Sequence, residues 1–168
     1  SQGPFAVPDP RISLHLLPRV LLSRGRLVGG IVTGVLALDA GSKLWAIKAL
    51  HRTFNSGGLV SLEHSSNSGL SFSGLNGQSW LVMILSVGVL LGLAIVVRRA
   101  ADTFSCVAIS LVLGGGLSNL IDRLLHGGRV TDFLGVLNWF VCNGADLAIS
   151  VGVGLVIVQV CLGRKVLR

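Results

Sequence analysis

Charged residues are scarce in this chain. They make up 12% of its 168 residues, and only seven of them are acidic. Hydrophobic residues account for 51% and the mean hydropathy is +0.79, values outside the range of ordinary soluble domains and typical of membrane proteins. We therefore expect one compact membrane bundle and not several soluble domains.

Cysteine and closely spaced metal ligands are also lacking. The three cysteines are odd in number and lie in or beside apolar stretches, so we interpret them as small core residues and not as a disulfide framework. No two of the four histidines stand at ligand spacing with each other or with a cysteine, which argues against a metal site. These residues are Cys106, Cys142 and Cys161, and His15, His51, His64 and His126.

The net charge of +7 needs a separate explanation. The basic residues form no stripe interleaved with aromatic residues, so a nucleic-acid partner is not expected. We interpret them as the flanks of membrane helices, in contact with anionic lipid.

Four charge-poor stretches are each near the ~20 residues needed to cross the core of a bilayer. The expected fold class is therefore an all-α membrane protein with four transmembrane helices, in one domain that covers residues 27–168. Residues 1–26 contain all four prolines and are expected to form a cytoplasmic or membrane-surface extension. The four stretches are 27–50, 79–97, 103–121 and 136–162.

Clusters of basic residues predict the orientation of these helices. Four spans put both ends of the bundle on one side, and three basic clusters fall on that side, so the positive-inside rule predicts cytoplasmic termini. Trp80 and Trp139 would then mark the outer ends of the second and fourth spans. The three clusters are Arg19, Arg24 and Arg26; Arg98 and Arg99; and Arg164, Lys165 and Arg168.

The outer segment 52–78 is rich in glycine, serine and asparagine but contains short alternations of apolar and polar residues. This pattern predicts a small extracytoplasmic β element between the first two helices. Asn67 lies in this segment, where a turn residue is the simplest interpretation. In the third span, the glycines at 114–116 would permit another helix or the substrate to approach closely.

Three aspartates, Asp122, Asp132 and Asp146, lie in or beside the apolar stretches of the second half. A carboxylate against hydrocarbon is costly unless it is paired, protonated or hydrated, so each is a candidate functional residue. The third and fourth spans are antiparallel neighbours with a short outer connection, so the topology places all three acids at one membrane depth.

Amides and a base accompany these acids at helical spacing. Asn119, Asp122 and Arg123 are offset by three and four residues and share one helix face, and Asn143 precedes Asp146 by three residues. We expect Arg123 to compensate the charge of its neighbour Asp122. By contrast, Asp132 is expected to lie in a flexible outer connection.

If Asp132 and Asp146 meet around a water molecule, they cannot easily both ionise, and one would retain a proton. The ionised acid could then take a proton from water while the protonated acid supports the carbonyl oxygen of a peptide bond. Spacing alone leaves open a buried polar network that fixes the helices, or a proton or ion pathway. Asp39 and Lys43 stand in the favourable order for a helical ion pair, which could fix the bundle or contact a substrate.

Five blocks of sequence resemble, in order, the motifs of bacterial lipoprotein signal peptidase (signal peptidase II). The resemblance covers about residues 27–162. Ser118 stands where the family usually has glycine, and Cys142 and Gly144 also depart from its pattern without removing a catalytic group. The blocks are LALDAGSK (36–43), NSGLSFS (67–73), SNLIDR (118–123), VTDF (130–133) and NGAD (143–146).

The resemblance implies an intramembrane aspartyl endopeptidase of the bacterial inner membrane, with its active site near the outer leaflet. Such an enzyme cleaves the signal peptide from diacylglyceryl-modified prolipoproteins on the N-terminal side of the lipidated cysteine. It would use no cofactor and no metal, contact membrane lipid, and be blocked by cyclic peptides such as globomycin. By motif position the catalytic pair would be Asp132 and Asp146, and the substrate-binding or supporting residues would be Asn119, Asp122, Arg123, Asn143, Asp39, Lys43 and Asn67.

Two other functions compete with this one. The first is a catalytically inactive or inhibitor-tolerant relative that binds prolipoproteins, although such a relative would be expected to lose one acid of the pair. The second is a small proton-coupled membrane carrier. A carrier is expected to place its acids near the midplane on broken helices, whereas this sequence gathers them at one end of its spans.

Overall fold

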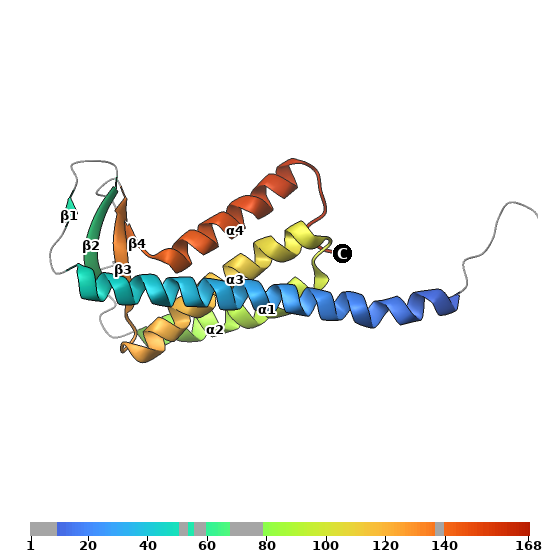
Figure 1. Cartoon of the computed structure of the whole chain (residues 1–168), viewed down its shortest axis with the longest axis horizontal. Helices are drawn as coiled ribbons and strands as arrows, with labels where there is room; N and C mark the ends of the chain where they lie inside the picture. The colour runs from blue at the N-terminus through green and yellow to red at the C-terminus, as the bar shows by residue number, and fades with distance from the viewer. Residues whose placement is uncertain (1–9, 51–53, 56–59, 68–78, 137–139) are drawn as a thin grey trace, which may run out of the picture.

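A computed structural model describes residues 10–50, 54–55, 60–67, 79–136 and 140–168. Long helices form a bundle, and an antiparallel sheet lies at one end of it (Figure 1). The start of α1 and the C-terminus both lie toward the opposite end. The helices are α1 (Pro10–Ala49), α2 (Ser79–Val96), the short 3-10 helix η1 (Val97–Arg99), α3 (Thr103–Leu125) and α4 (Gly144–Cys161).

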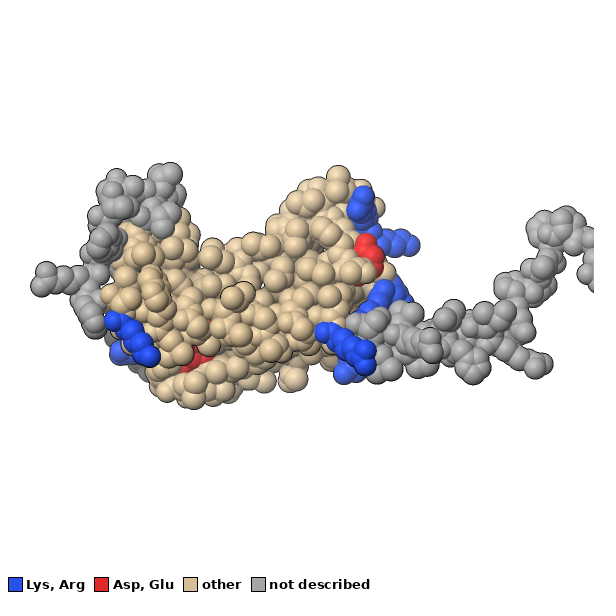
Figure 2. Space-filling view, in the orientation of Figure 1, with Lys and Arg blue, Asp and Glu red and all other residues tan. Residues whose placement is uncertain are grey.

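In the described part of the chain, four helical segments are long and apolar enough to cross a membrane, which confirms the predicted fold class. Their outer faces expose large apolar side chains such as Leu85, Leu91 and Val160, as expected for surfaces that face lipid. Lys and Arg gather at the two ends of the bundle, with an almost uncharged band between them (Figure 2). The segments are Arg24–Ala49, Trp80–Arg99, Thr103–Leu125 and Gly144–Cys161.

The predicted start of the fourth span, at residue 136, is wrong. Val136 ends a strand, and α4 begins only at Gly144. Asn143 sets this boundary as the N-cap, because its side chain accepts a hydrogen bond from the backbone N–H of Asp146, whose carboxylate accepts one from the Asn143 N–H in return. At the other end of the chain, α1 runs from Pro10 through residue 26 without a break, and the separate extension stays a prediction.

The sheet has four strands in the order β1-β2-β3-β4, and all neighbours are antiparallel. The β element predicted within 52–78 is present as β1 and β2, but β3 and β4 come from the connection between α3 and α4. Asp132 therefore lies in a strand and not in a flexible connection. The strands are β1 (Phe54–Asn55), β2 (Val60–Asn67), β3 (Val130–Val136) and β4 (Phe140–Cys142).

Strand β3 was missed because it has no alternating polar face. Val130, Thr131, Asp132 and Phe133 are all buried, so side chains on both faces are covered. The chain turns from α3 into this strand through Gly127 and Gly128, whose φ angles of 62° and 88° suit residues without a Cβ.

Helix α3 is the centre of the bundle and packs against the other three long helices. Its contact with α4 is backbone against backbone. A Cβ added at Gly115 would lie 2.4 Å from the carbonyl oxygen of Ala145, and one added at Gly152 would lie 2.6 Å from the carbonyl oxygen of Ala108. The close approach predicted for the glycines of the third span is therefore present at Gly115.

A polar network closes the end of the bundle opposite the sheet. Asp102 caps α3 by accepting hydrogen bonds from the backbone N–H and the hydroxyl of Ser105, at 2.7 and 2.8 Å. These bonds hold the pKa of the Asp102 carboxyl below its usual value of 3.8. The fully buried Gln159 joins α4 to this cap through a 2.8 Å bond to the Ser105 hydroxyl.

Candidate active site

A buried cluster of charges joins α1 to α3. The Nζ atom of Lys43 lies 2.7 Å from Oδ2 of Asp39 and 3.2 Å from Oδ2 of Asp122. The predicted helical ion pair between Asp39 and Lys43 is therefore confirmed, and one lysine compensates acids on two helices. All three side chains are almost fully buried, where an unpaired charge would be costly.

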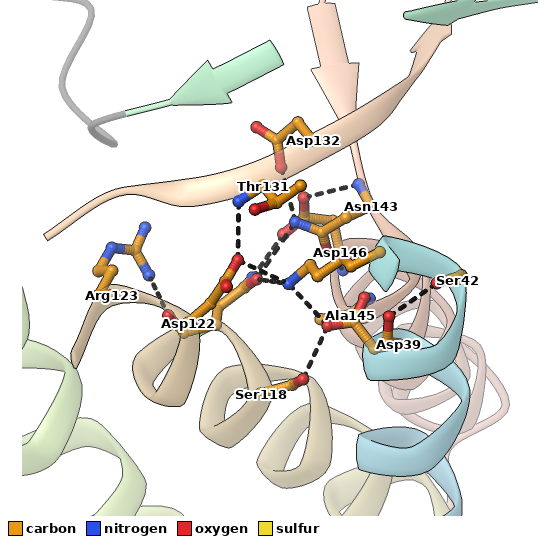
Figure 3. Close-up of polar contacts among 12 residues, drawn as sticks. Asp39, Ser42, Ser118, Asp122, Arg123, Thr131, Asp132, Asn143, Ala145 and Asp146 are labelled. Atoms are coloured by element: carbon orange, nitrogen blue, oxygen red, sulfur yellow. Dashed lines mark hydrogen bonds and ion pairs between the residues drawn. The ribbon is translucent and has the colours of Figure 1, made fainter. Parts of the chain in front are cut away.

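Arg123 does not compensate Asp122, so that prediction is wrong. Among the described residues the lysine or arginine that pairs with Asp122 is Lys43, and the imidazole of His126 also contacts Asp122, with its Nδ1 2.6 Å from Oδ1. The Arg123 guanidinium instead donates to the backbone carbonyl of Asn119, at 3.3 Å (Figure 3). Adjacent residues of a helix point in directions about 100° apart, which keeps the two side chains from facing each other.

Asp122 also ties α3 to strand β3. Its Oδ2 accepts a 2.7 Å hydrogen bond from the backbone N–H of Thr131, the residue before Asp132 (Figure 3). The position of Asp132 therefore depends on Asp122. His126 was not predicted to belong to the site, although its offset of four residues from Asp122 was a usable signal.

Asn143 connects the two acids expected to form the catalytic pair. Its Nδ2 donates to Oδ1 of Asp132 at 2.6 Å, and its backbone N–H donates to Oδ2 of Asp146 at 3.2 Å. Asn119 completes the link by donating from Nδ2 to Oδ1 of Asp146 at 2.8 Å. Asp132 on β3 and Asp146 on α4 are thus both bonded to Asn143, one by its side chain and the other by its backbone (Figure 3).

Asp39 fixes the first turn of α4 as well as pairing with Lys43. Its Oδ1 accepts a 2.8 Å bond from the backbone N–H of Ala145, and its Oδ2 accepts a 2.7 Å bond from the Ser118 hydroxyl. Ser118, one of the residues that depart from the family pattern, thus adds a hydrogen bond beside the site. Ala145 immediately precedes Asp146, so Asp39 holds the backbone that carries this acid.

Cys142 ends strand β4 and directly precedes Asn143. Burial raises the pKa of the Cys142 thiol, and the neighbouring acids Asp146 and Asp132 raise it further, so the thiol is held in its neutral form. Asn67 lies in β2 opposite Val130, and its side chain lies outside what the structure describes. In the described ranges, no group of three His, Cys, Asp or Glu side chains could hold a metal ion.

An apolar groove of about 430 Å³ leads to this site between α2, α3 and α4. Its polar lining residues are Ser86, Asn119 and Arg123. Because Asn119 is bonded to Asp146, the groove ends beside one of the two acids. Its walls include the apolar residues Val82, Leu85, Val89, Leu90 and Ile149.

Comparison with known proteins agrees with this geometry. The family model described as "Signal peptidase (SPase) II" matches residues 31–162. The chain belongs to the signal peptidase II family. It is 34% identical over 161 residues to the lipoprotein signal peptidase of Caulobacter vibrioides, an alignment that covers 89% of this chain and 95% of the relative.

Other relatives support the same assignment. The lipoprotein signal peptidase of Rhodococcus jostii is 33% identical over 157 residues, which cover 88% of this chain and 79% of that protein. Two solved structures of a bacterial membrane enzyme are each 26% identical and cover 80% of this chain. Their TM-scores are 0.73 and 0.71, and 92% and 87% of their own chains are covered. The chain is therefore a multi-pass membrane protein and a peptidase.

Proposed function

We propose that this signal peptidase II cleaves prolipoprotein signal peptides with Asp132 and Asp146 as its catalytic pair. The observation that carries the proposal is the contact of Asn143 with both carboxylates. Its side-chain amide donates to Asp132 on a strand, and its backbone N–H donates to Asp146 on a helix. Asp132 is almost fully buried, and Asp146 is half-buried beside the apolar groove. This pair suits acid–base chemistry on a water molecule that lies between them.

In the proposed reaction one acid of the pair is ionised and the other is protonated. The ionised acid takes a proton from water as the water oxygen attacks the carbonyl carbon, while the protonated acid gives its proton to the carbonyl oxygen. The resulting gem-diol then collapses: the acid that is now ionised takes a proton from one hydroxyl, the C–N bond breaks, and the amide nitrogen leaves with the proton of the other acid, which restores the starting state of the pair. Acid–base assistance of this kind contributes about 10²–10⁴-fold to a rate.

The groove between α2, α3 and α4 is proposed to hold the apolar helix of the signal peptide. Arg123 lines this groove, and its Nε is buried with no hydrogen-bond partner in the part of the chain that the structure describes. A buried donor without a partner is costly, so a backbone carbonyl of the substrate is a suitable acceptor. Asn119 and Asn143 would orient the acids, and Asn67 is proposed to contact substrate from β2.

Asp39, Lys43 and Asp122 are proposed to support the site and not to contact the substrate. Their charges are paired with one another. The two aspartates accept hydrogen bonds from the backbone beside the acids of the pair, and Lys43 donates to the side chain of Asn119. Removing Lys43 would leave two buried carboxylates without a compensating charge.

The proposed location is the bacterial inner membrane, with both termini in the cytoplasm and the active site near the outer leaflet. The basic residues at the end opposite the sheet support this orientation, and Trp80 is exposed in the first turn of α2 at the sheet end. The substrate would then present its diacylglyceryl cysteine to the outer leaflet. Membrane lipid and cyclic peptides such as globomycin are proposed as further ligands.

Cleavage of a diacylglyceryl prolipoprotein, followed by gel shift, tests this function. Asp132→Asn and Asp146→Asn should each lower turnover by at least about 10²-fold, since each removes one acid–base group. The matched control is Asp102→Asn, which changes an acid at the opposite end and keeps a good N-cap residue there. Full cleavage by either site variant would refute the assignment, and an unlipidated prolipoprotein checks the substrate class.

A further inference from the structure

We propose that a second groove, at the end of the bundle opposite the sheet, binds an anionic phospholipid from the leaflet at that end. This groove has a volume of about 470 Å³ and lies between α1, α2 and α3. Two arginines, Arg24 and Arg98, contribute to its lining. The site lies apart from the catalytic pair, and the inference stands without the proposed peptidase mechanism.

The shape of the groove favours a ligand that has a hydrocarbon chain. Apart from the two arginines, its lining is apolar or glycine, with Val28 on α1, Ala94 on α2 and Leu113 on α3. Leu113 lies ten residues into α3, about 15 Å from the start of that helix, so the groove reaches the membrane-spanning region there. A water-soluble anion would leave this apolar part empty, whereas an acyl chain would fill it.

Arg24 is positioned to hold a phosphate at the end of this groove. It is half-buried, and its Nη1 donates a 3.0 Å hydrogen bond to the carbonyl oxygen of Ala100, next to η1. A guanidinium has five N–H donors in a planar arrangement, so it can keep this bond and bind phosphate oxygens as well. Arg98 is exposed on η1 and supplies a second positive charge.

The surrounding charge favours an anionic lipid over a zwitterionic one. Among the described residues, neither Arg24 nor Arg98 forms an ion pair with an acid. The acid near this end, Asp102, is bonded to Ser105 and Gln159. The headgroup cation of a zwitterionic lipid would meet further basic residues of the same end, which are Arg26, Arg99, Arg164, Lys165 and Arg168.

Native mass spectrometry of the purified full chain tests this site. The protein in neutral detergent is mixed with equal amounts of phosphatidylglycerol and phosphatidylcholine that carry the same acyl chains. We expect the wild type to retain phosphatidylglycerol preferentially. The double variant Arg24→Gln/Arg98→Gln should lose about tenfold or more of this affinity, because charge-assisted hydrogen bonds to the phosphate are removed.

A charge-matched variant distinguishes lipid binding in the groove from general attraction by the positive charges at this end. Arg164→Gln/Lys165→Gln removes the same two charges at the same end, but these residues do not line the groove. It should keep most of the preference for phosphatidylglycerol, because Arg24 and Arg98 remain in the groove, and lose only the smaller part that the surrounding positive charge supplies. The proposal would be overturned if both double variants lost the same affinity for phosphatidylglycerol, or if the wild type showed no preference for this lipid.

A second substitution tests the acyl chain without touching an arginine. Gly25 lines the groove and has no atom within 4 Å of an added Cβ, so Gly25→Phe should fill the groove and weaken lipid binding about tenfold. Gly154→Phe on α4 is the control, since Gly154 also faces open space but lies outside the groove. Unchanged lipid binding in Gly25→Phe, or binding of soluble glycerol phosphate as tight as that of the lipid, would contradict the assignment. Thermal unfolding in lipid-free detergent checks that each variant is folded.

Discussion

Gly115 stands at the closest approach of α3 and α4, and we predict that Gly115→Ala both destabilises the bundle and slows the peptidase. The new Cβ would lie 2.4 Å from the carbonyl oxygen of Ala145 and 2.8 Å from Cγ1 of Ile149. The first distance is about 1 Å shorter than the ordinary contact distance of 3.4 Å. Because Ala145 contributes a backbone atom, the clash can be relieved only by moving one helix away from the other.

The expected loss of stability follows from two opposing effects. Alanine is favoured over glycine within a helix by about 1 kcal/mol. Forcing an extra carbon into a packed interior costs about 1–3 kcal/mol, and a backbone contact places Gly115 at the upper end of that range. We therefore expect a net destabilisation of about 1–2 kcal/mol.

The effect on turnover should be larger than the effect on stability. Ala145 donates its N–H to Asp39 and precedes Asp146, so a shift of this turn moves an acid of the pair. A displacement of about 1 Å in a catalytic group can cost about 10²-fold in rate. Reversible unfolding in detergent and the prolipoprotein cleavage rate measure the two effects.

Gly29→Ala is the matched control for this prediction. Gly29 also lies in a membrane-spanning helix, but an added Cβ there meets no atom within 4 Å. The control should be as active as the wild type and equally stable or slightly more stable. If Gly115→Ala behaves like this control, the close backbone contact does not position the acid and the reasoning is refuted.

Two further predictions concern His126 and Cys142. His126→Leu should lower kcat about tenfold, because Asp122 loses its 2.6 Å contact with the imidazole. His126→Asn keeps a hydrogen-bond donor and should retain most of the activity. Equal kcat values for the two variants would contradict a positioning role for His126. The raised pKa of the buried Cys142 predicts slow maleimide labelling at pH 7, which speeds up only when the pH exceeds the usual pKa range of a thiol. The exposed Cys161 should react first. Peptide mass spectrometry locates the label, and rapid labelling of Cys142 at pH 7 would contradict the prediction.

The sequence predicts the helices well because length and hydropathy determine whether a segment can span a bilayer. The pair of Asp39 and Lys43 was also predictable, since an offset of four residues places two side chains together on any helix. The start of α4 had a usable signal in Asn143 and Asp146, which are spaced as a capping box. Hydropathy instead placed the start of the span at residue 136, because the end of β3 and the strand β4 are as apolar as a membrane helix.

The rest of the site depends on contacts that local patterns do not contain. Strand β3 is buried on both faces, so no alternation marks it, and the strand position of Asp132 follows from pairing with β2. Charge compensation of Asp122 by Lys43 joins residues from two helices, whereas sequence proximity suggested Arg123. The roles of the site residues stay proposals that the aspartate variants test.

The two acids and their supports come from four separate elements: α1 contributes Asp39, α3 contributes Asn119, β3 contributes Asp132 and α4 contributes Asp146. Helix α4 is the last of these to leave the ribosome, and Asn143, which joins the pair, directly precedes it. A chain whose synthesis or membrane insertion is incomplete therefore has no assembled pair. If Asp132 and Asp146 are the catalytic pair, peptidase activity arises only after α4 has packed into the bundle.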